Sequence, residues 1–188
     1  MVNRAVNCLV LGDSGVGKTC LLLCFANNAF PAGYVPGYIQ DIRVKMEIGE
    51  ELYKIDFVDT PGHTDWDHLR RLLYPRKTNV LLICFSVTSL KSLDNIREKW
   101  VPEIKKRFAG VPWLLVGTKV DTGNDPGTRE GLPQRLVERD EGVATAKALG
   151  AVKYLECSAW SQWRVKELLN EVAVTSLNYK QKGHCIIL

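Results

Sequence analysis

The sequence predicts an α/β fold in which helices cover both faces of a doubly wound, mostly parallel sheet of six strands. Three observations favour this fold. Short apolar runs alternate with stretches of helical spacing along the chain. The run Val80–Phe85 is apolar almost throughout, as expected of a strand that is covered on both faces. The length of 188 residues suits a single domain with a substantial core.

The first half of the chain predicts three strands and one helix. Val6–Leu11 is a buried strand, and an apolar helical stretch begins at Cys20. Ile42–Ile48 and Leu52–Val58 flank a short polar turn, Gly49–Glu51, and this arrangement predicts a β-hairpin. Sheets of this class bind ligands at the carboxyl ends of their strands, so the loops that follow the strands are the place to look for a site.

The second half continues the alternation. Leu90–Phe108 has helical spacing, with Ser89 as a cap and Pro102 as an expected kink. The remaining expected elements are the strands Trp113–Val116 and Val152–Leu155, the helix Val143–Leu149 ended by Gly150, and the last helix, Val165–Leu177.

Thr122–Asp140 interrupts this rhythm because it is polar and contains several Gly and Pro residues. We expect a surface insertion with a short helix around Gln134–Arg139. A plain loop and a partner-docking element both fit this composition, and the sequence leaves the choice open.

Charge and cysteine content exclude several classes. The net charge of +4 is small, and its basic clusters (Arg70-Arg71, Arg76-Lys77 and Lys105-Lys106-Arg107) suit solvated helix faces better than a nucleic-acid-binding stripe. The six cysteines show no metal-type spacing, and there is no signal peptide or run of transmembrane length. We therefore expect free thiols, a cytoplasmic chain and no nucleic-acid partner.

The most informative motif is Gly12–Thr19, which has the pattern G-x-x-x-x-G-K-[ST] between a strand and a helix. Its glycines let successive backbone N–H groups and the helix N-terminus face a phosphate. Lys18 would reach the β- and γ-phosphates, and the Thr19 hydroxyl would bind Mg²⁺. The alternative is an ordinary Gly-rich turn between strand and helix, which this context disfavours.

Three later strand ends carry further pieces of a nucleotide site. Asp59 can hold Mg²⁺ through water, and the Gly62 N–H can approach a γ-phosphate. In Thr118-Lys119-Val120-Asp121, the Asp121 carboxylate can accept hydrogen bonds from N1 and the 2-amino group of guanine, whereas adenine would leave it unpaired. Backbone N–H groups of Cys157-Ser158-Ala159 can bind the guanine O6.

With these motifs the chain resembles the Ras superfamily of small GTPases, and within it the Rho family, from Val6 to the last residue. The matching segments are Asn28-Ala29-Phe30-Pro31, Trp66-Asp67-His68-Leu69-Arg70, Tyr74-Pro75, Leu82-Ile83-Cys84-Phe85-Ser86, Gly117–Asp121 and Gly150–Ala159. Two further features are typical of the Rho family. Thr118 stands where most other small GTPases have Asn, and an insertion follows at Thr122–Asp140.

The resemblance implies a P-loop NTPase fold of the small G-protein type, Mg²⁺ as cofactor, and GTP or GDP as bound nucleotide. Phe30 would stack on the guanine, and Tyr34 would lie over the phosphates. The expected nucleotide-binding residues are Ser14, Gly15, Val16, Gly17, Lys18, Thr19, Cys20, Phe30, Tyr34, Gly37, Asp59, Gly62, Thr118, Lys119, Asp121, Ser158 and Ala159. The resemblance also implies a monomer that meets Rho-type exchange factors, activating proteins, a GDP-dissociation inhibitor and effectors.

The C-terminus suggests a lipid anchor. Cys185-Ile186-Ile187-Leu188 fits the C-a-a-X pattern, and its terminal Leu favours a geranylgeranyl group on Cys185, although a chance Cys is the alternative. One prenyl chain anchors only marginally, and just Lys180 and Lys182 support it, with His184 nearby. We expect residues 1–178, with the insertion 122–140, to form the GTP-binding domain and 179–188 a tail. The tail would attach the chain reversibly to the cytoplasmic face of a membrane, with the plasma membrane as the first expectation.

Three positions depart from the Rho pattern and affect hydrolysis. Ser14 stands where the family usually has Gly, and Gly37 replaces a Thr whose hydroxyl ligates Mg²⁺. Asp59-Thr60-Pro61-Gly62-His63 replaces Asp-Thr-Ala-Gly-Gln, so His63 stands where a Gln orients the attacking water. His63 either positions water itself, with Lys18 as the other catalytic residue, or is an exposed loop histidine. Tyr38–Ile42 is also unlike the usual Rho effector sequence, so effectors cannot be carried over.

We therefore expect a Rho-like switch, acting in signalling to the cytoskeleton and cell polarity by resemblance, with slow GTP hydrolysis. Two other functions remain open. One is a GTP-locked binding module that hydrolyses nothing useful. The other is a P-loop kinase or ATPase, which Asp121, the prenylation motif and the lack of an Arg-rich lid segment argue against.

Overall fold

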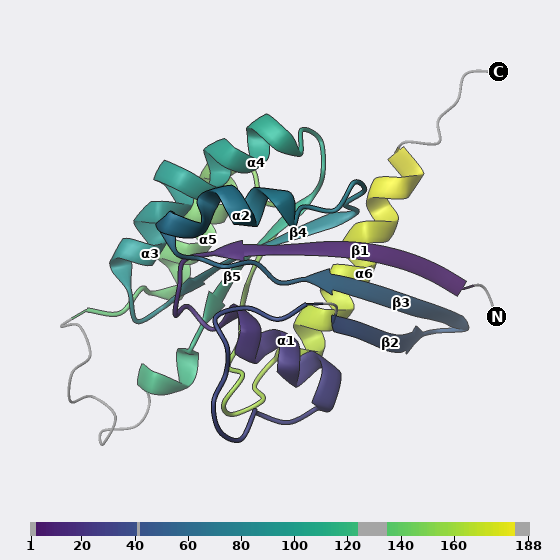
Figure 1. The fold of residues 1–188 in the computed structure, drawn as a ribbon, viewed down its shortest axis with the longest axis horizontal. Helices are drawn as coiled ribbons and strands as arrows, with labels where there is room; N and C mark the ends of the chain where they lie inside the picture. The colour runs from purple at the N-terminus through teal and green to yellow at the C-terminus, as the bar shows by residue number, and fades with distance from the viewer. Residues whose placement is uncertain (1–2, 41, 124–134, 183–188) are drawn as a thin grey trace.

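A computed structural model of the chain describes residues 3–40, 42–123 and 135–182. It contains one six-stranded sheet in the order β2-β3-β1-β4-β5-β6 (Figure 1). The strands are β1 (Asn3–Gly12), β2 (Ile42–Ile48), β3 (Glu51–Val58), β4 (Val80–Ser86), β5 (Trp113–Thr118) and β6 (Lys153–Glu156). Only β2 and β3 pair antiparallel, which confirms the mostly parallel sheet and the hairpin.

Nine helical segments connect and cover these strands in the part of the chain that the structure describes. They are α1 (Lys18–Asn27), η1 (Thr64–Trp66), α2 (Asp67–Leu72), α3 (Leu90–Asn95), η2 (Ile96–Trp100), α4 (Val101–Arg107), η3 (Val120–Gly123), α5 (Arg139–Leu149) and α6 (Val165–Lys182). None of the helices in the described ranges is both long and apolar enough to cross a membrane.

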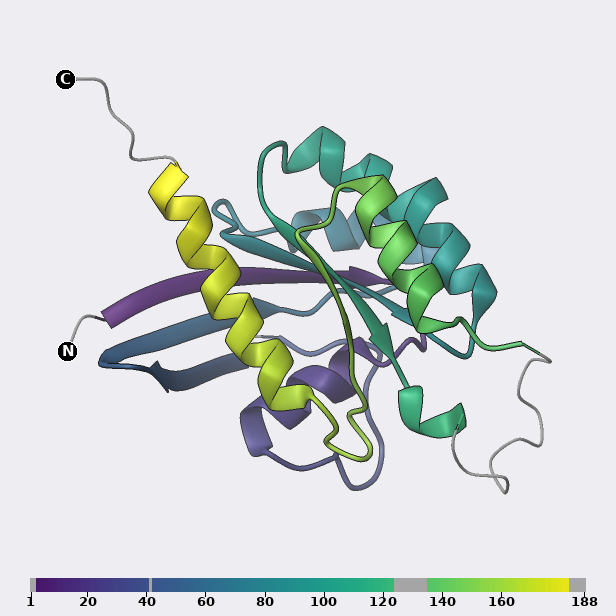
Figure 2. The same cartoon turned by 180° about the vertical axis from the view of Figure 1, so that it is seen from behind.

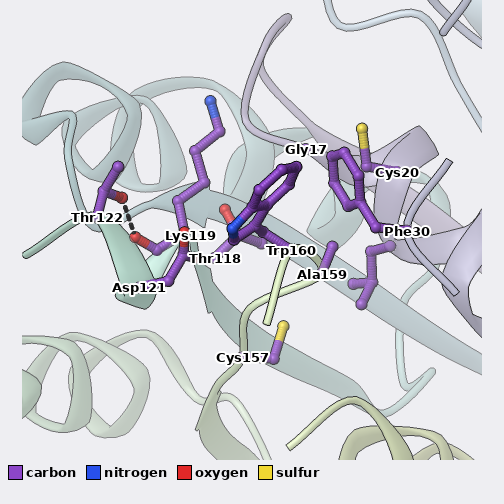
Figure 3. A pocket seen from close by; sticks show the side chains of 11 residues that line it. Gly17, Cys20, Phe30, Thr118, Lys119, Asp121, Thr122, Cys157, Ala159 and Trp160 are labelled. Atoms are coloured by element: carbon purple, nitrogen blue, oxygen red, sulfur yellow. Dashed lines mark hydrogen bonds between the residues drawn. The ribbon is translucent and has the colours of Figure 1, made fainter. Parts of the chain in front are cut away.

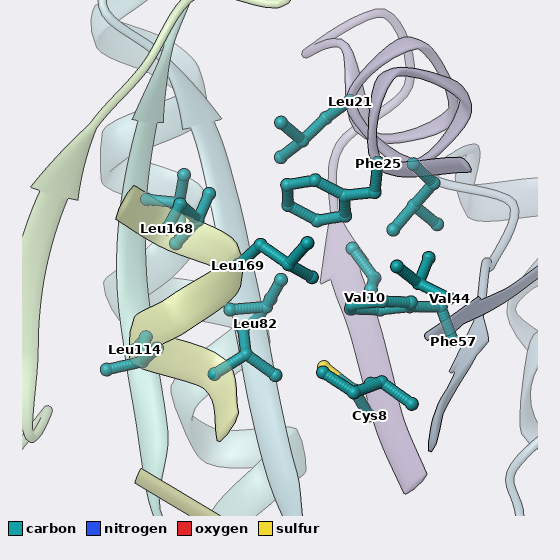
Figure 4. Packing of buried hydrophobic residues seen from close by; sticks show 14 of the residues in the cluster. Cys8, Val10, Leu21, Phe25, Val44, Phe57, Leu82, Leu114, Leu168 and Leu169 are labelled. Carbon is teal, nitrogen blue, oxygen red and sulfur yellow. The ribbon is translucent and has the colours of Figure 1, made fainter. Parts of the chain in front are cut away.

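The sheet separates two hydrophobic cores, because alternate residues of each strand point to opposite faces. Cys8 and Val10 of β1 pack with helices α1 and α6, whereas Leu9 and Leu11 pack with α3, α4 and α5. Figure 4 shows the first core, in which side chains of α1, α6 and the sheet meet. Helix α6 crosses its face of the sheet along most of its length (Figure 2). Both faces are therefore covered, as the doubly wound fold requires.

The expected helix Leu90–Phe108 is interrupted. Ser89 caps it as predicted, accepting a hydrogen bond from the Ser92 N–H at 3.2 Å, but a π-helical segment, η2, separates α3 from α4. Pro102 stands at the start of α4. Proline has no N–H to donate to the preceding turn. The helix therefore changes its hydrogen-bond register just before Pro102, where the sequence predicted a kink at Pro102 itself.

The prediction of a short helix around Gln134–Arg139 is wrong for the part of this range that the structure describes. Residues 135–138 are not helical, and α5 begins at Arg139, four residues earlier than the apolar pattern indicated. Gly150 ends α5 in the left-handed conformation with φ 86°, as predicted. The rest of the insertion, residues 124–134, lies outside the described residues.

Candidate nucleotide site

The loop between β1 and α1 has the backbone shape that its glycines predict. Gly12 has φ 142°, and a Cβ on it would lie 2.2 Å from the carbonyl oxygen of Cys84 in the neighbouring strand β4. Gly15 and Gly17 have φ 75° and 97°, a region that side chains disfavour. The motif therefore wraps the start of α1 and presents its N-terminus, the arrangement that binds phosphate.

Lys18 lies at the centre of this loop and is 4% exposed. Its ammonium group donates hydrogen bonds to the carbonyl oxygens of Gly12 at 2.9 Å and Asp13 at 2.8 Å. Burial lowers the pKa of Lys18, while the nearby carboxylate of Asp59 acts in the opposite direction. An ammonium group has three N–H donors, so one stays available for the β- and γ-phosphates.

Thr19 and Asp59 fit the expected Mg²⁺ site. The Thr19 hydroxyl lies 2.6 Å from Oδ2 of Asp59, which also accepts a hydrogen bond from the Ile39 N–H at 3.1 Å. Burial raises the pKa of Asp59, so a bound cation would stabilise its charged form. The described residues hold no cluster of three His, Cys, Asp or Glu side chains that could bind a metal. A Mg²⁺ ion here would thus take its other ligands from phosphate and water, as Mg²⁺ commonly does.

The segment after β3 closes directly on the phosphate loop. A Cβ on Gly62 would lie 2.3 Å from the backbone nitrogen of Ser14, so no side chain fits at position 62 in this arrangement. The next residue, His63, points elsewhere. Its Nδ1 accepts a hydrogen bond from the Asp65 N–H at 3.3 Å, which caps η1, and its side chain is 60% exposed. Here His63 occupies a capping position, consistent with the second of the two roles considered for it.

Two predicted site residues of the loop between α1 and β2 are exposed. Tyr34 is 91% exposed, and the expectation that it covers the phosphates stays a prediction. Gly33, with φ 95°, precedes it, and residues 29–40 form no regular helix or strand that would hold the ring. Gly37 is exposed, and a Cβ on it would meet no atom within 4 Å.

The predicted base-binding residues meet around a pocket of about 340 Å³ at the carboxyl ends of β5 and β6 (Figure 3). Gly17, Cys20, Phe30, Thr118, Lys119, Asp121 and Ala159 line it, although they come from four separate parts of the sequence. The Thr118 hydroxyl lies 2.5 Å from the carbonyl oxygen of Val16 and 2.9 Å from that of Phe85. It thereby fastens the base-binding strand to the phosphate loop.

One expectation in this pocket needs correction. The Cys157 N–H donates to the carbonyl of Gly117 at 2.9 Å, and the Ser158 N–H donates to that of Trp163 at 3.0 Å. Ser158 itself is fully buried. Both amides are used by the fold because the chain turns back after β6. Of these three backbone N–H groups, that of Ala159 has no partner among the described residues. It is therefore the donor that can bind the guanine O6.

The comparison with known families agrees with this geometry. A sequence profile of the Ras family matches residues 7–178, which is nearly the whole chain. The chain belongs to the Ras family of small GTPases. The six-stranded sheet with flanking helices is accordingly the small G-protein form of the P-loop fold, and members of this family bind GTP or GDP, generally with Mg²⁺.

The structure adds Trp160 to the base pocket of this GTPase. Its ring lies 5.0 Å from that of Phe30, edge to face at 75°, and both line the pocket with Asp121 (Figure 3). The Gln162 side chain holds the loop by donating to the carbonyl of Ala159 at 2.6 Å. Two adjacent aromatic rings offer π-faces to a purine. The aromatic residue directly after Ser158-Ala159 was the sequence signal for this role.

We predict that Trp160→Ala weakens GDP and GTP binding alike, by about tenfold to a hundredfold, because stacking of a base on an aromatic ring is worth ~1–3 kcal/mol. Trp163→Ala is a matched control: Trp163 lies in the same loop but packs against Arg164 and does not line the pocket. Dissociation constants for both nucleotides measure the effect. Equal losses in the two variants would contradict the stacking role.

The phosphate loop is also tied to the helices beside it. The Asp13 carboxylate accepts hydrogen bonds from the Trp100 indole at 2.8 Å and from Asn95 at 2.6 Å. The Arg70 guanidinium lies 4.6 Å from the centre of the Trp100 ring and pairs with Asp67 and Glu103. Arg70 is fully buried, so its expected place on a solvated helix face is wrong. This network joins the phosphate loop to α2, the helix that follows Gly62.

Proposed function

We propose that this small GTPase is a Rho-like molecular switch that hydrolyses GTP slowly. The observation that carries the proposal is the coupling between the Mg²⁺ position and both loops that follow it. Asp59 is hydrogen-bonded to Thr19 and to the Ile39 N–H, and Gly62 abuts Ser14. Loss of the γ-phosphate would therefore affect both the loop that contains Ile39 and the segment that contains Gly62. Loops ordered by γ-phosphate and Mg²⁺ and released on hydrolysis are a general switching device.

Chromatography of the nucleotide released by denaturing the purified protein tests the switch. We expect GTP or GDP, and we expect GTP but not ATP to compete for the emptied site. A bound adenine nucleotide would favour the kinase or ATPase alternative. Turnover measured with and without a Rho-type activating protein separates a slow switch from a GTP-locked binding module, since only the former releases phosphate.

Slow hydrolysis is supported by three positions. Ser14 adds a side chain within the phosphate loop, Gly37 offers no hydroxyl to Mg²⁺, and the His63 side chain is engaged in capping η1. Catalysis of phosphoryl transfer depends almost entirely on positioning and electrostatics. Loosening these parts therefore lowers the rate more than it lowers nucleotide affinity.

The Rho-like proposal includes a prenyl group on Cys185, which lies outside the described residues, and Rho-type exchange factors, activating proteins, GDP-dissociation inhibitor and effectors as partners. Its signalling role would concern the cytoskeleton and cell polarity. The chain would then move between the cytoplasm and the cytoplasmic face of the plasma membrane, because a single prenyl chain binds reversibly.

We predict that Cys185→Ser makes the chain wholly soluble in a host that prenylates proteins. The native chain should divide between the membrane and soluble fractions in a salt-sensitive manner, because only Lys180 and Lys182 support the anchor in the tail. Fractionation with and without added salt measures this. Salt-resistant membrane binding by the Ser variant would reveal another anchor.

A further inference from the structure

A basic cleft lies at the end of the sheet opposite the nucleotide pocket. It is formed where α2 ends and β4 begins, beside the end of α4, and its volume is about 510 Å³. Arg71, Arg76, Lys77 and Arg107 line it, and none of its lining residues is acidic. The sequence predicted that Arg76 and Lys77 lie on a solvated helix face. This prediction is wrong, because α2 ends at Leu72. The four cations therefore converge on one hollow rather than spreading along a helix.

One of the residues that line the cleft carries a buried hydroxyl group without a hydrogen-bond partner. Thr78 lines the cleft and is 8% exposed, and its Oγ1 has no hydrogen-bond partner among the described residues. A buried, unpaired hydroxyl costs free energy, so its retention calls for an explanation. A ligand that accepts its hydrogen bond would supply one.

The backbone around Thr78 is held firmly in place. The Asn7 side chain donates to the carbonyl of Lys77 at 3.0 Å, and Asn7 and Asn79 exchange two further hydrogen bonds at 2.9 Å. These bonds fasten residues 77–79 to strand β1. The backbone of Lys77 and Thr78 is thus held in place, which lowers the entropic cost of ordering this part of the cleft around a ligand.

The charges of the cleft are only partly compensated. Glu103 lies 3.6 Å from Arg71 but also pairs with the buried Arg70, and Arg107 lies 6.0 Å above the Tyr74 ring. Within the described ranges, neither Arg76 nor Lys77 has an ion-pair partner. Two exposed cations in the cleft are free to meet an anion.

We propose that this cleft is a second anion site that binds a phosphomonoester group, carried either by a lipid headgroup or by a soluble polyphosphorylated alcohol. A phosphate offers several acceptor oxygens to the forked guanidinium donors, to the ammonium group and to the Thr78 hydroxyl at once. The compact grouping of the cations favours such a headgroup over a nucleic-acid strand, which would need an extended stripe.

The position of the cleft suits a lipid source. The elements that form it lie at the end of the molecule where helix α6 finishes (Figure 1). If the tail carries the prenyl group of the proposed function, a headgroup in the cleft would be the second membrane contact that a single prenyl chain requires. The cleft itself does not depend on that modification.

The test uses the full chain made without prenylation and loaded with GDP and Mg²⁺, so that its phosphate loop is occupied. One arm titrates inositol trisphosphate by calorimetry. The other measures cosedimentation with phosphatidylcholine vesicles that contain phosphatidylinositol bisphosphate, or an equal charge of phosphatidylserine. Binding in both arms indicates a lipid headgroup site, and binding only in the first indicates a soluble ligand; either supports the proposal.

Three variants locate the binding. We expect Arg76→Ala with Lys77→Ala to weaken it by about a hundredfold and Thr78→Val by about tenfold, since hydrogen bonds to charged groups are individually strong. Lys45→Ala with Lys54→Ala is the matched control. These two lysines face each other on the exposed hairpin, and replacing them removes the same charge at a place away from the cleft. Thr78→Val preserves shape and removes an unpaired hydroxyl, so its thermal unfolding should show no loss of stability.

Three results would overturn the proposal: no binding in either arm, equal losses in the cleft and control variants, or equal binding to phosphatidylserine vesicles that Thr78→Val leaves unchanged. The last would mean attraction by charge alone. A fourth result, tight binding of single-stranded RNA at the same residues, would assign the cleft to nucleic acid and overturn the proposal as well. Nucleotide affinity is measured on every variant. Because it should stay constant, failure of the GTPase assignment and failure of this site are distinguishable.

Discussion

Replacing Asp121 with Asn is expected to change the base preference of this GTPase from guanine to xanthine. The Asp121 carboxylate lines the base pocket with Lys119 and Ala159 and can accept hydrogen bonds from N1 and the 2-amino group of guanine. The side-chain amide of Asn would place its N–H₂ donor against the 2-amino group of guanine, which is also a donor. Xanthine has a carbonyl at this position, which accepts a hydrogen bond from the amide. We expect GTP affinity to fall on the order of 10³-fold, because a mispaired polar group in a binding site is costly.

Competition binding with GTP and xanthosine triphosphate measures this change, and xanthosine triphosphate should gain affinity as GTP loses it. Asp140→Asn is a control of identical chemistry, since Asp140 is exposed in the first turn of α5, away from the pocket residues. An Asp121→Asn variant that kept tight GTP binding would show that the base lies elsewhere.

Restoring the two missing parts of the hydrolysis site is expected to raise GTP turnover. Gly37→Thr together with His63→Gln should increase the rate by about tenfold or more, each tenfold corresponding to about 1.4 kcal/mol off the barrier. A Cβ at position 37 would meet no atom within 4 Å, so there is open space in which a threonine side chain can begin. A glutamine at 63 replaces a histidine that caps η1 through the Asp65 N–H.

Single-turnover phosphate release from the GTP-loaded protein gives the rate, and the dissociation constant for GTP shows that binding is unchanged. The variant His63→Ala decides between the two roles of His63. If the histidine only caps η1, its removal leaves the slow rate nearly as it was. If His63→Ala abolishes an appreciable basal rate and His63→Gln brings no gain, the histidine already orients the water and our account of the slow rate is wrong.

The local pattern of the sequence was sufficient for most of the sheet. Val80–Phe85 lies within β4, and the hairpin Ile42–Ile48 with Leu52–Val58 is β2 and β3, because a strand's side-chain period and turn residues are local properties. The π-helical segment before Pro102 was not predicted, since a change in hydrogen-bond register depends on the side chains that the helix packs against.

Most base and phosphate residues could also be predicted, because they follow strands whose carboxyl ends lie at one edge of the sheet. Phe30 follows helix α1 instead, and its place came from the family resemblance. Trp160 was missed since it contacts Phe30, 130 positions earlier, and no local pattern contains that pair. The conformations of Tyr34 and His63 could not be predicted either. Both lie in irregular loops, where side-chain direction depends on neighbours rather than on period.

The sequence by itself determined the order of the elements, the phosphate loop and the residue that reads the base, because these depend on spacing along the chain. Only the tertiary structure decided what each charge does. Arg70 and Arg71 are adjacent in the sequence, yet one is fully buried against Trp100 and the other lines an open cleft. Residues far apart in the chain set the burial and pairing of a charge, and these determine whether it holds the fold together or is free to bind an anion.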